Sequence, residues 1–415
     1  MGDGEAMDED RIINFSGLRM SRDTWHNFRW DVAAASVFSL FNVVFNQFYI
    51  PIALRHGASD FEVGLLAAAP AVGLLFSPAW AGLMEGRSPK PFFLLPNLIG
   101  RLLLIIPALY STPVMFVLTA FLFHLLMGIQ APAYAALMTR LYPADQRGRL
   151  MGNVRVIMGL LMLPLAWVTG LWIDASGSSG PLLVAAVTGA LSLIAFQQVR
   201  EVPRFFAGGK GEALRLSLFG QLRLLRGNRP VLIFLAATSL AGFGNMLASP
   251  LYAIYQVNEL GLSNAQIGYL RMAYFACMLL AYLIAGWAID RFSPQAVMAC
   301  GLTAMTTVPF LYGLVGTFPA VLAASGIQGI SDAVWDIGCM AFVFHFARGR
   351  EAVVFGLHLM LFGIRGTAGP LIGTSLNGAM PFGGMMLFVG ALGLAGLLLF
   401  LGSRIRSEDG VTAEE

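Results

Sequence analysis

The chain has 415 residues, of which 57% are hydrophobic and only 12% are charged. Soluble domains carry about 25% charged residues. This composition therefore excludes an ordinary soluble protein and indicates a chain whose main solvent is lipid. The net charge of +3 does not predict a nucleic-acid partner, because the basic residues follow the membrane topology described below.

Apolar stretches of roughly 20 residues, the length that crosses a bilayer as a helix, follow one another along the chain. The first set of six covers residues 31–54, 62–84, 92–110, 113–139, 150–173 and 180–199. The second set covers residues 231–257, 264–289, 295–314, 317–346, 352–377 and 382–403. We therefore predict an all-α membrane protein with twelve transmembrane helices. Its expected parts are a cytoplasmic tail (1–30), a first six-helix bundle (31–199), a cytoplasmic linker (200–230), a second bundle (231–403) and a cytoplasmic tail (404–415).

The basic residues predict which side of the membrane each loop faces, because short cytoplasmic loops are rich in Lys and Arg. With both termini inside, 21 of the 26 basic residues fall in cytoplasmic segments, against Arg55 alone outside and four within spans. The acidic N-terminus has no apolar core before Asp31, so we expect no cleavable signal peptide. The linker contains an amphipathic stretch, ALRLSLFGQLRLL, expected to lie on the inner leaflet. These features predict a multi-pass protein of a plasma or bacterial inner membrane.

A short segment between spans occurs twice. AGLMEGRSPK at residues 81–90 returns as GWAIDRFSPQ at residues 286–295, each where a long apolar run breaks. Glu85 matches Asp290, and the Ser-Pro step is present in both copies. Such duplication is typical of a transporter built from two halves.

The second copy carries the resemblance to a known family. Gly286, Asp290 and Arg291 follow the G-x-x-x-D-R pattern that the major facilitator superfamily has between its second and third and its eighth and ninth spans. The first copy departs from that pattern, with Ala81 for the Gly and Gly86 for the Arg. The resemblance implies two pseudo-symmetric six-helix bundles that work by alternating access.

Charged residues at the expected cytoplasmic helix ends form a predicted gate. A carboxylate there can bind the N-terminus of a neighbouring helix and a nearby Arg, in a contact that forms in one state and breaks in the other. A simple topological role for these charges is the alternative. The predicted gating residues are Glu85, Asp290, Arg291, Arg147, Arg149, Arg348 and Arg350.

Polar residues repeat along the first and seventh spans. FNVVFNQFY aligns with GNMLASPLY, which pairs Asn42 with Asn245, Asn46 with Ser249 and Tyr49 with Tyr252. Within each trio the spacing of i, i+4 and i+7 forms one stripe along a helix. The family resemblance implies that spans 1, 4, 7 and 10 line a central cavity, so we expect both stripes to contact the solute. Hydrogen bonds to neighbouring helices are the alternative.

Asp332 and Asp336 lie four residues apart on the tenth predicted span, with Trp335 beside them. Charges at this depth cost about 2.5–3.5 kcal/mol each on insertion scales. Two carboxylates on one helix face cannot both stay ionised cheaply unless a cation neutralises them, so one is expected to exchange a proton. Arg365, on the next span, is the expected cation. A purely structural ion pair is the alternative.

The other titratable residues within spans have weaker functional interpretations. Arg101 and Arg155 are expected to be structural, and Arg271 is a further cation. His124 replaces the Arg of the family's fourth-span motif, four residues before Gly128, but a lone buried His usually packs; His358 is treated in the same way. The three Cys residues lack metal-ligand spacing, and we expect no cofactor and no metal.

The sequence therefore predicts a secondary transporter, expected to be a monomer, that moves a small organic solute with protons as the coupling ion. Arginines outnumber aspartates within the spans, four to two, which favours an anionic or zwitterionic solute. One alternative is an efflux pump for amphipathic drugs, using the aromatic residues Phe45, Phe48, Tyr49, Tyr252, Tyr255 and Trp335, although the fifth span lacks the Gly-Pro-Gly-Gly pattern of the family's drug antiporters. A non-transporting receptor or scaffold is a second alternative. No nucleophile–base pair suggests an enzyme.

Overall fold

The structure, a computed structural model, describes residues 12–15, 18–77, 80, 84, 87–143, 145–201, 228–347 and 351–402. These residues are helical apart from turns, an isolated bridge between Asn377 and Met380, and one antiparallel hairpin of β1 (Ile12–Phe15) and β2 (Leu18–Ser21). The contacts divide the chain into two compact units. Unit 1 comprises residues 1–56 and 73–208, and unit 2 comprises residues 57–72 and 209–415.

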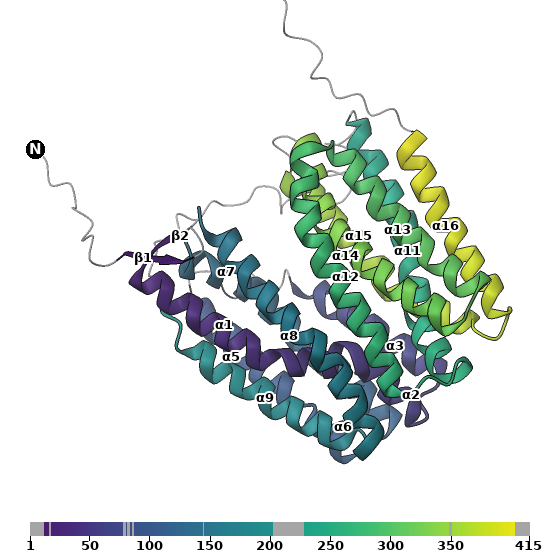
Figure 1. Cartoon of the computed structure of the whole chain (residues 1–415), viewed down its shortest axis with the longest axis horizontal. Helices are drawn as coiled ribbons and strands as arrows, with labels where there is room; N and C mark the ends of the chain where they lie inside the picture. The colour runs from purple at the N-terminus through teal and green to yellow at the C-terminus, as the bar shows by residue number, and fades with distance from the viewer. Residues whose placement is uncertain are drawn as a thin grey trace, which may run out of the picture. The chain divides into compact units, whose positions relative to one another are not determined.

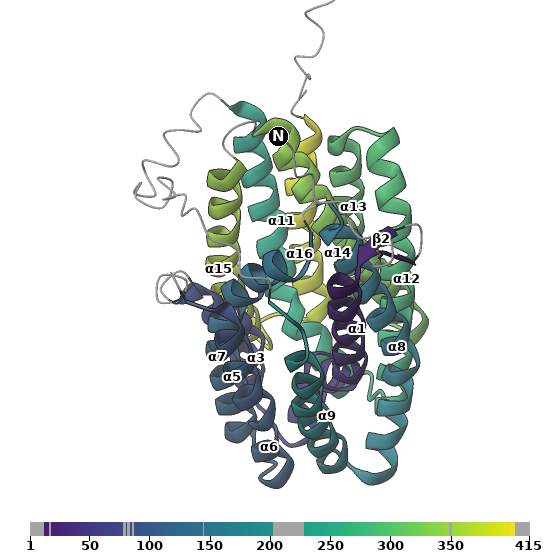
Figure 2. The same cartoon turned by 90° about the vertical axis from the view of Figure 1, so that its left-hand side faces the viewer.

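Unit 1 is built from the helices of the first half. They are α1 (Arg22–Val43), the π-helical turn η2 (Val44–Phe48), α2 (Tyr49–Arg55), α5 (Pro89–Leu102), α6 (Ile105–Leu109), α7 (Pro113–Leu141), α8 (Arg147–Ser176) and α9 (Ser179–Gln197). Within this unit α1 packs against α8 and α9, and α5 packs against α7 and α9 (Figures 1 and 2). Met20 of the hairpin is buried in the core of the same unit, beside α1 and α7 residues. The predicted N-terminal tail therefore contributes to the packing of the bundle.

Unit 2 contains α11 (Arg229–Ile254), the π-helical turn η4 (Tyr255–Glu259), α12 (Asn264–Arg291), α13 (Pro294–Leu314), α14 (Phe318–Phe346), α15 (Glu351–Leu376) and α16 (Phe382–Gly402). The long helices run side by side, green to yellow in Figure 1. Helix α14 packs between α12 and α13, while α11 packs against α15 and α16. These pairings decide which buried polar residues can meet.

Helix α3 (Asp60–Leu75) belongs to both units. Its residues up to Val72 group with unit 2, although the sequence repeat places them in the first half, and the residues from Gly73 group with unit 1. A side chain at Gly64 would collide with Thr374 of α15, and one at Gly73 would collide with the backbone carbonyl of His124 in α7. Small residues therefore permit close helix packing at both ends of α3.

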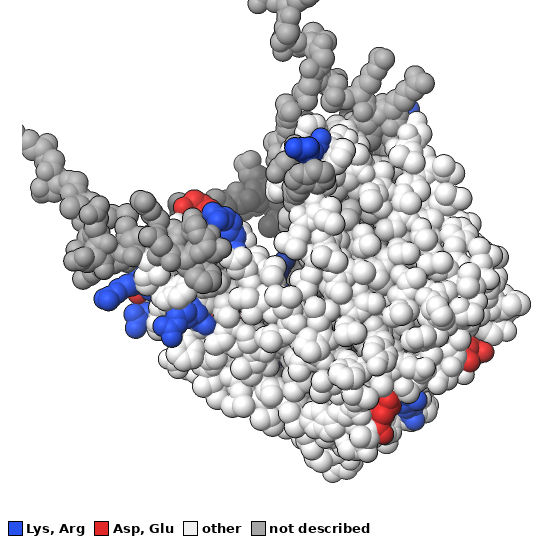
Figure 3. Space-filling model, viewed as in Figure 1, with Lys and Arg blue, Asp and Glu red and all other residues white. Residues whose placement is uncertain are grey.

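Ten helical segments in the described part of the chain are long and apolar enough to cross a membrane. The other two predicted spans, 62–84 and 352–377, correspond to α3, with 16 helical residues, and α15, with 26. On the face seen in Figure 3, charged side chains gather near the helix ends of each unit and the flanks are almost free of them. The all-helical membrane fold predicted from the sequence is confirmed.

Helix boundaries differ from the predicted spans mainly at the first helix. Helix α1 begins at Arg22 rather than at Asp31, because the Ser21 side chain caps it by accepting from the Thr24 backbone N–H at 3.2 Å. Hydropathy locates the lipid-facing part of a helix and misses a polar first turn. As a result Asp31 lies inside a helix, 6% exposed, and its carboxylate accepts a 2.8 Å hydrogen bond from the Tyr142 hydroxyl. The predicted amphipathic helix of the linker lies outside the described residues.

The repeated Ser-Pro step begins a helix in both units. Ser88 is the N-cap of α5 and Ser293 is the N-cap of α13, and each is followed by Pro at the first helical position, where its missing N–H costs nothing. Ser293 Oγ accepts from the Ala296 backbone N–H at 3.3 Å. Ser88 Oγ instead donates to Glu201 at 2.9 Å. The repeated Ser-Pro step thus has a local structural role, the start of a helix, in addition to any gating role of the segment.

Candidate functional site

The two intramembrane aspartates of α14 both bond to tyrosines of α12. The Tyr274 hydroxyl donates to Asp332 Oδ2 at 2.8 Å, and the Tyr282 hydroxyl donates to Asp336 Oδ2 at 2.8 Å. The side chain of Asp332 is partly buried and that of Asp336 is exposed. Because α12 and α14 pack along each other, the pair forms a row of two carboxylate–phenol contacts along one seam of unit 2.

Arg365 does not pair with either aspartate. Its Nη1 donates to the Thr238 carbonyl of α11 at 2.7 Å, and its guanidinium lies 5.7 Å from the Trp335 ring centroid. Gly242 makes room for this group, since a Cβ there would lie 2.7 Å from Arg365 Cζ. The expected Asp–Arg pair is absent because α15 packs against α11, which turns Arg365 away from the carboxylates of α14.

The remaining arginines within spans behave differently from one another. Arg101 is 6% exposed and donates to the Gly189 carbonyl at 2.8 Å, to Ser192 and to Asn97, so it ties α5 to α9. Arg155 is exposed. Arg271 of α12 has no hydrogen bond or ion pair among the residues that the structure describes, and its Nε is buried without a partner. Arg271 and Arg365 thus lie apart from Asp332 and Asp336.

The two polar stripes have the same pattern of burial in the two units. Asn42 and Asn245 are partly buried, Asn46 and Ser249 are exposed, and Tyr49 and Tyr252 are 4% and 8% exposed. The Tyr49 hydroxyl donates to the Phe116 carbonyl at 3.0 Å, whereas the Tyr252 hydroxyl has no partner in the described part of the chain. In each stripe the first two residues are therefore at least partly accessible and the tyrosine is buried.

Three of the six aromatic residues considered for drug binding lie in the interior of unit 1. Phe45, Phe48 and Tyr49 are at most 5% exposed, and the Phe45 ring packs 4.3 Å from that of Phe123. His124 lies beside the same cluster, 5.7 Å from Phe45. His358 stacks on Phe234 of α11 at 5.7 Å. These contacts are those of packing residues.

The structure describes the predicted gate only in part. Glu85, Arg348 and Arg350, and the side chain of Asp290, lie outside the described residues. Arg149 and Arg291 are exposed. Arg147, at the first turn of α8, donates to the Tyr142 carbonyl at 3.3 Å and thereby binds the C-terminal end of α7.

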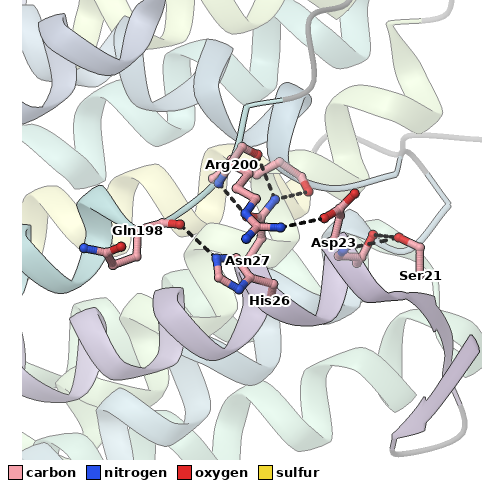
Figure 4. A network of polar contacts seen from close by, with 8 residues as sticks. Ser21, Asp23, His26, Asn27, Gln198 and Arg200 are labelled. Carbon is pink, nitrogen blue, oxygen red and sulfur yellow. Dashed lines mark hydrogen bonds and ion pairs between the residues drawn. The ribbon is translucent and has the colours of Figure 1, made fainter. Parts of the chain in front are cut away.

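A network that the sequence does not predict holds the segment after α9 (Figure 4). The Asn27 side chain donates to the Arg200 carbonyl at 3.0 Å and accepts from the Arg200 N–H at 2.7 Å. Asp23 pairs with the Arg200 guanidinium at 3.3 Å, and His26 contacts the Gln198 carbonyl at 3.0 Å. Next to it, Glu201 accepts from Ser88 and pairs with Arg140 at 3.0 Å. The start of the central linker is therefore fixed to unit 1.

Comparison with known proteins agrees with this architecture. A sequence model of the Major Facilitator Superfamily matches residues 32–241 and 234–415. The Staphyloferrin B transporter of Staphylococcus aureus is 29% identical over 286 residues, which are 65% of this chain and 65% of that protein, just under two thirds of its length.

Solved structures of membrane transporters share the fold. The nucleoside transporter NupG has a TM-score of 0.72 at 13% identity, over 92% of this chain and 99% of that chain. A POT family transporter in complex with a thioalcohol-conjugated peptide has a TM-score of 0.71 at 13% identity, over 94% of this chain and 96% of that chain.

Proposed function

The chain belongs to the major facilitator superfamily, a family of transporters rather than enzymes, and from this premise we propose that it carries a small organic anion or zwitterion across the membrane in exchange or symport with protons. The two halves alternate access to a central site, as in the family. Asp332 and Asp336 carry the proton, and the arginines of unit 2 attract the solute.

The separation of two arginines from the two aspartates of α14 in unit 2 is the observation that carries this proposal. Asp332 and Asp336 accept from tyrosines, while Arg271 and Arg365 have no carboxylate partner among the described residues. A salt-bridged carboxylate would be locked in its ionised form. A carboxylate whose partner is a phenol can be protonated without leaving a buried cation unpaired. Conversely, an arginine without a counter-ion inside a span is costly unless an anion binds it.

The tyrosine contacts suit a group that gains and loses a proton. A hydroxyl can donate to a carboxylate, and it can rotate to accept from a carboxylic acid. The Tyr274–Asp332 contact therefore remains satisfied in both protonation states. Asp336, which is exposed, supplies a second carboxylate four residues away on the same helix face.

The similarity of this chain to the Staphyloferrin B transporter supports the proposal that its solute is an organic compound. A test panel therefore includes staphyloferrin B together with small mono- and dicarboxylates, a zwitterionic amino acid and a cationic amphipathic dye. The dye tests the drug-efflux alternative. A receptor or scaffold would transport none of these compounds.

The basic residues favour cytoplasmic termini and residence in a plasma or bacterial inner membrane. The repeated segment (residues 81–90 and 286–295), with Glu85 and Asp290, is proposed to hold the cytoplasmic side closed together with the neighbouring arginines. The stripe residues Asn42, Asn46, Asn245 and Ser249 are proposed to contact the solute, because they are the members that each unit leaves accessible.

Transport into proteoliposomes tests the proposal. Uptake of the panel is measured with and without an imposed pH gradient, in the wild type and in Asp332→Asn, with Asp145→Asn as the matched control because Asp145 is exposed and lies outside the spans. We expect an anion or zwitterion to accumulate only with the gradient, and Asp332→Asn to abolish that accumulation. Gradient-driven uptake of the dye alone would instead identify a drug pump.

A further inference from the structure

Unit 2 contains buried polar atoms without a hydrogen-bond partner in the part of the chain that the structure describes. The Tyr252 hydroxyl, Gln256 Oε1 and Arg271 Nε are each buried with no hydrogen bond among the residues that the structure describes. Tyr252 is 8% exposed and Gln256 is 1% exposed. Leaving a buried polar atom without a hydrogen bond destabilises the folded protein, so three such atoms indicate a site for a bound group.

Two of the three groups, Tyr252 and Gln256, contact the side chain of Tyr312 on α13. The Tyr252 ring lies 4.4 Å from the Tyr312 ring, and Gln256 Nε2 donates to the Tyr312 hydroxyl at 2.6 Å. Arg271 of α12 is close enough to Tyr312 and Tyr274 for its charge to act on both side chains. Arg271 and Tyr274 are only partly buried, so Arg271 is the member of the set that stays partly accessible.

The neighbouring Tyr255 shows that a tyrosine hydroxyl in this segment can find a partner. The Tyr255 hydroxyl donates to the Gly316 carbonyl at 2.9 Å, and its ring stacks on Phe382 at 4.1 Å. The matching tyrosine of unit 1, Tyr49, is also satisfied. The unpaired hydroxyl at Tyr252 is therefore not a property of buried tyrosines in this fold.

We propose that Tyr252, Gln256 and Arg271, which lie near Tyr312, bind the end of the solute that bears a carboxylate next to a hydroxyl or ammonium group. Arg271 N–H and Tyr252 O–H are donors and suit the carboxylate. Gln256 Oε1 is an acceptor, because its amide nitrogen is already committed to Tyr312, and it requires a donor from the ligand. This inference rests on the proposed function and assigns a solute class to one part of the carrier.

Equilibrium binding tests the site without any gradient. The probes are malate and succinate, two dicarboxylates that differ by one hydroxyl, and the readout is the affinity of the purified wild type and its variants from calorimetry. We expect malate to bind about tenfold more tightly than succinate, because succinate leaves Gln256 Oε1 unpaired. Gln256→Leu should remove that preference while retaining the binding of both.

Three further variants distinguish a loss of ligand binding from a loss of folding. Tyr252→Phe removes a hydroxyl that has no partner among the described residues, so the ligand-free melting temperature should stay unchanged while the affinity for malate falls about tenfold. Tyr255→Phe is the matched control; it removes a bonded hydroxyl, lowers the melting temperature and leaves malate affinity unchanged. Arg271→Gln should abolish the binding of both acids.

Several results would overturn the site. The first is that neither acid binds at millimolar concentration, and the second is that the wild type binds malate and succinate with equal affinity. The third is that Tyr252→Phe and Arg271→Gln both bind malate as tightly as the wild type, which would mean that only ordered water occupies the site. Gradient-driven transport of an anion that persists in Arg271→Gln would reject the site and leave the proposed function standing. A wild type that moves no anion would reject the function itself.

Discussion

Tyr252 occupies the position in the second half that Tyr49 occupies in the first, and the two hydroxyls differ in their partners. Tyr49 donates to the Phe116 carbonyl at 3.0 Å, while Tyr252 has no partner within the described residues. The two halves thus have corresponding helices and differ in the hydrogen bonding of their buried polar side chains. The same asymmetry appears in the aspartates, which the second half has at Asp332 and Asp336 and the first half replaces by Ala131 and Ala135.

This difference predicts opposite responses to one substitution. Tyr49→Phe should destabilise the protein by about 1 kcal/mol, because the Phe116 carbonyl loses its donor. Tyr252→Phe should leave the free energy of unfolding unchanged or raise it, because an unsatisfied hydroxyl is removed. Thermal unfolding of both variants in the same detergent measures the difference. Equal destabilisation would show that Tyr252 has a partner in the membrane.

Close packing of α3 on α15 predicts that Gly64 is intolerant of any side chain. A Cβ at Gly64 would meet Thr374 Oγ1 and lie 3.2 Å from the Pro370 carbonyl. Asp60 and Asn377, near the same ends, form a 2.7 Å hydrogen bond. Gly64→Ala should therefore separate these helices and reduce transport at least about tenfold, since overpacking costs about 1–3 kcal/mol. Gly148→Ala, where a Cβ meets nothing within 4 Å, is the control and should transport normally.

Asn27 is predicted to hold the segment that leaves α9. Its amide is 1% exposed and bonds to both backbone groups of Arg200 and to the Leu141 carbonyl. Asn27→Ala should cost about 1–3 kcal/mol of unfolding free energy, because buried backbone groups lose their partners. Asp23→Ala removes only an ion pair whose side chains are 64% and 66% exposed, and should cost much less. The rate of proteolytic cleavage after Arg200 should rise in Asn27→Ala and stay at the wild-type value in Asp23→Ala.

His56 predicts a pH dependence at the loop between α2 and α3. Its Nε2 lies 2.8 Å from Ser178 Oγ, and burial lowers the pKa of His56 from 6.5. The unfolded chain then binds the proton more readily, so this contribution to stability is present above pH 6.5 and is lost as pH falls through the lower folded-state value. The effect should be small, because the imidazole is exposed. A pH series of melting temperatures should show a shallower acid limb for His56→Asn, and identical limbs would contradict the assignment.

Local patterns predict some of these features and tertiary packing decides the others. Asp332 and Asp336 share a face because they are four residues apart, which the sequence shows directly. Their partners Tyr274 and Tyr282 depend on the pairing of α12 with α14, which no periodicity encodes. Arg365 was expected beside the aspartates because its helix follows theirs in sequence, yet that helix packs against α11.

The stripe on the first span shows a related limit. The spacing of Asn42, Asn46 and Tyr49 assumes a regular helix, but the chain forms a π-helical turn at Val44–Phe48. Such a turn inserts a wider loop of backbone and rotates the residues that follow it. Tyr49 lies in the interior of unit 1, where the Phe116 carbonyl accepts its hydrogen bond. Tyr252 is buried as well although α11 is regular at that point, so the turn alone does not explain this burial.

The dependence of solute accumulation on Asp332 tests the central claim most directly. Wild type and Asp332→Asn are reconstituted with the anion identified by the panel, and two rates are measured: exchange of labelled for unlabelled solute without a gradient, and net uptake under an imposed pH gradient. A proton-carrying aspartate predicts that Asp332→Asn keeps exchange and loses gradient-driven uptake. Full gradient-driven uptake in Asp332→Asn would contradict the account.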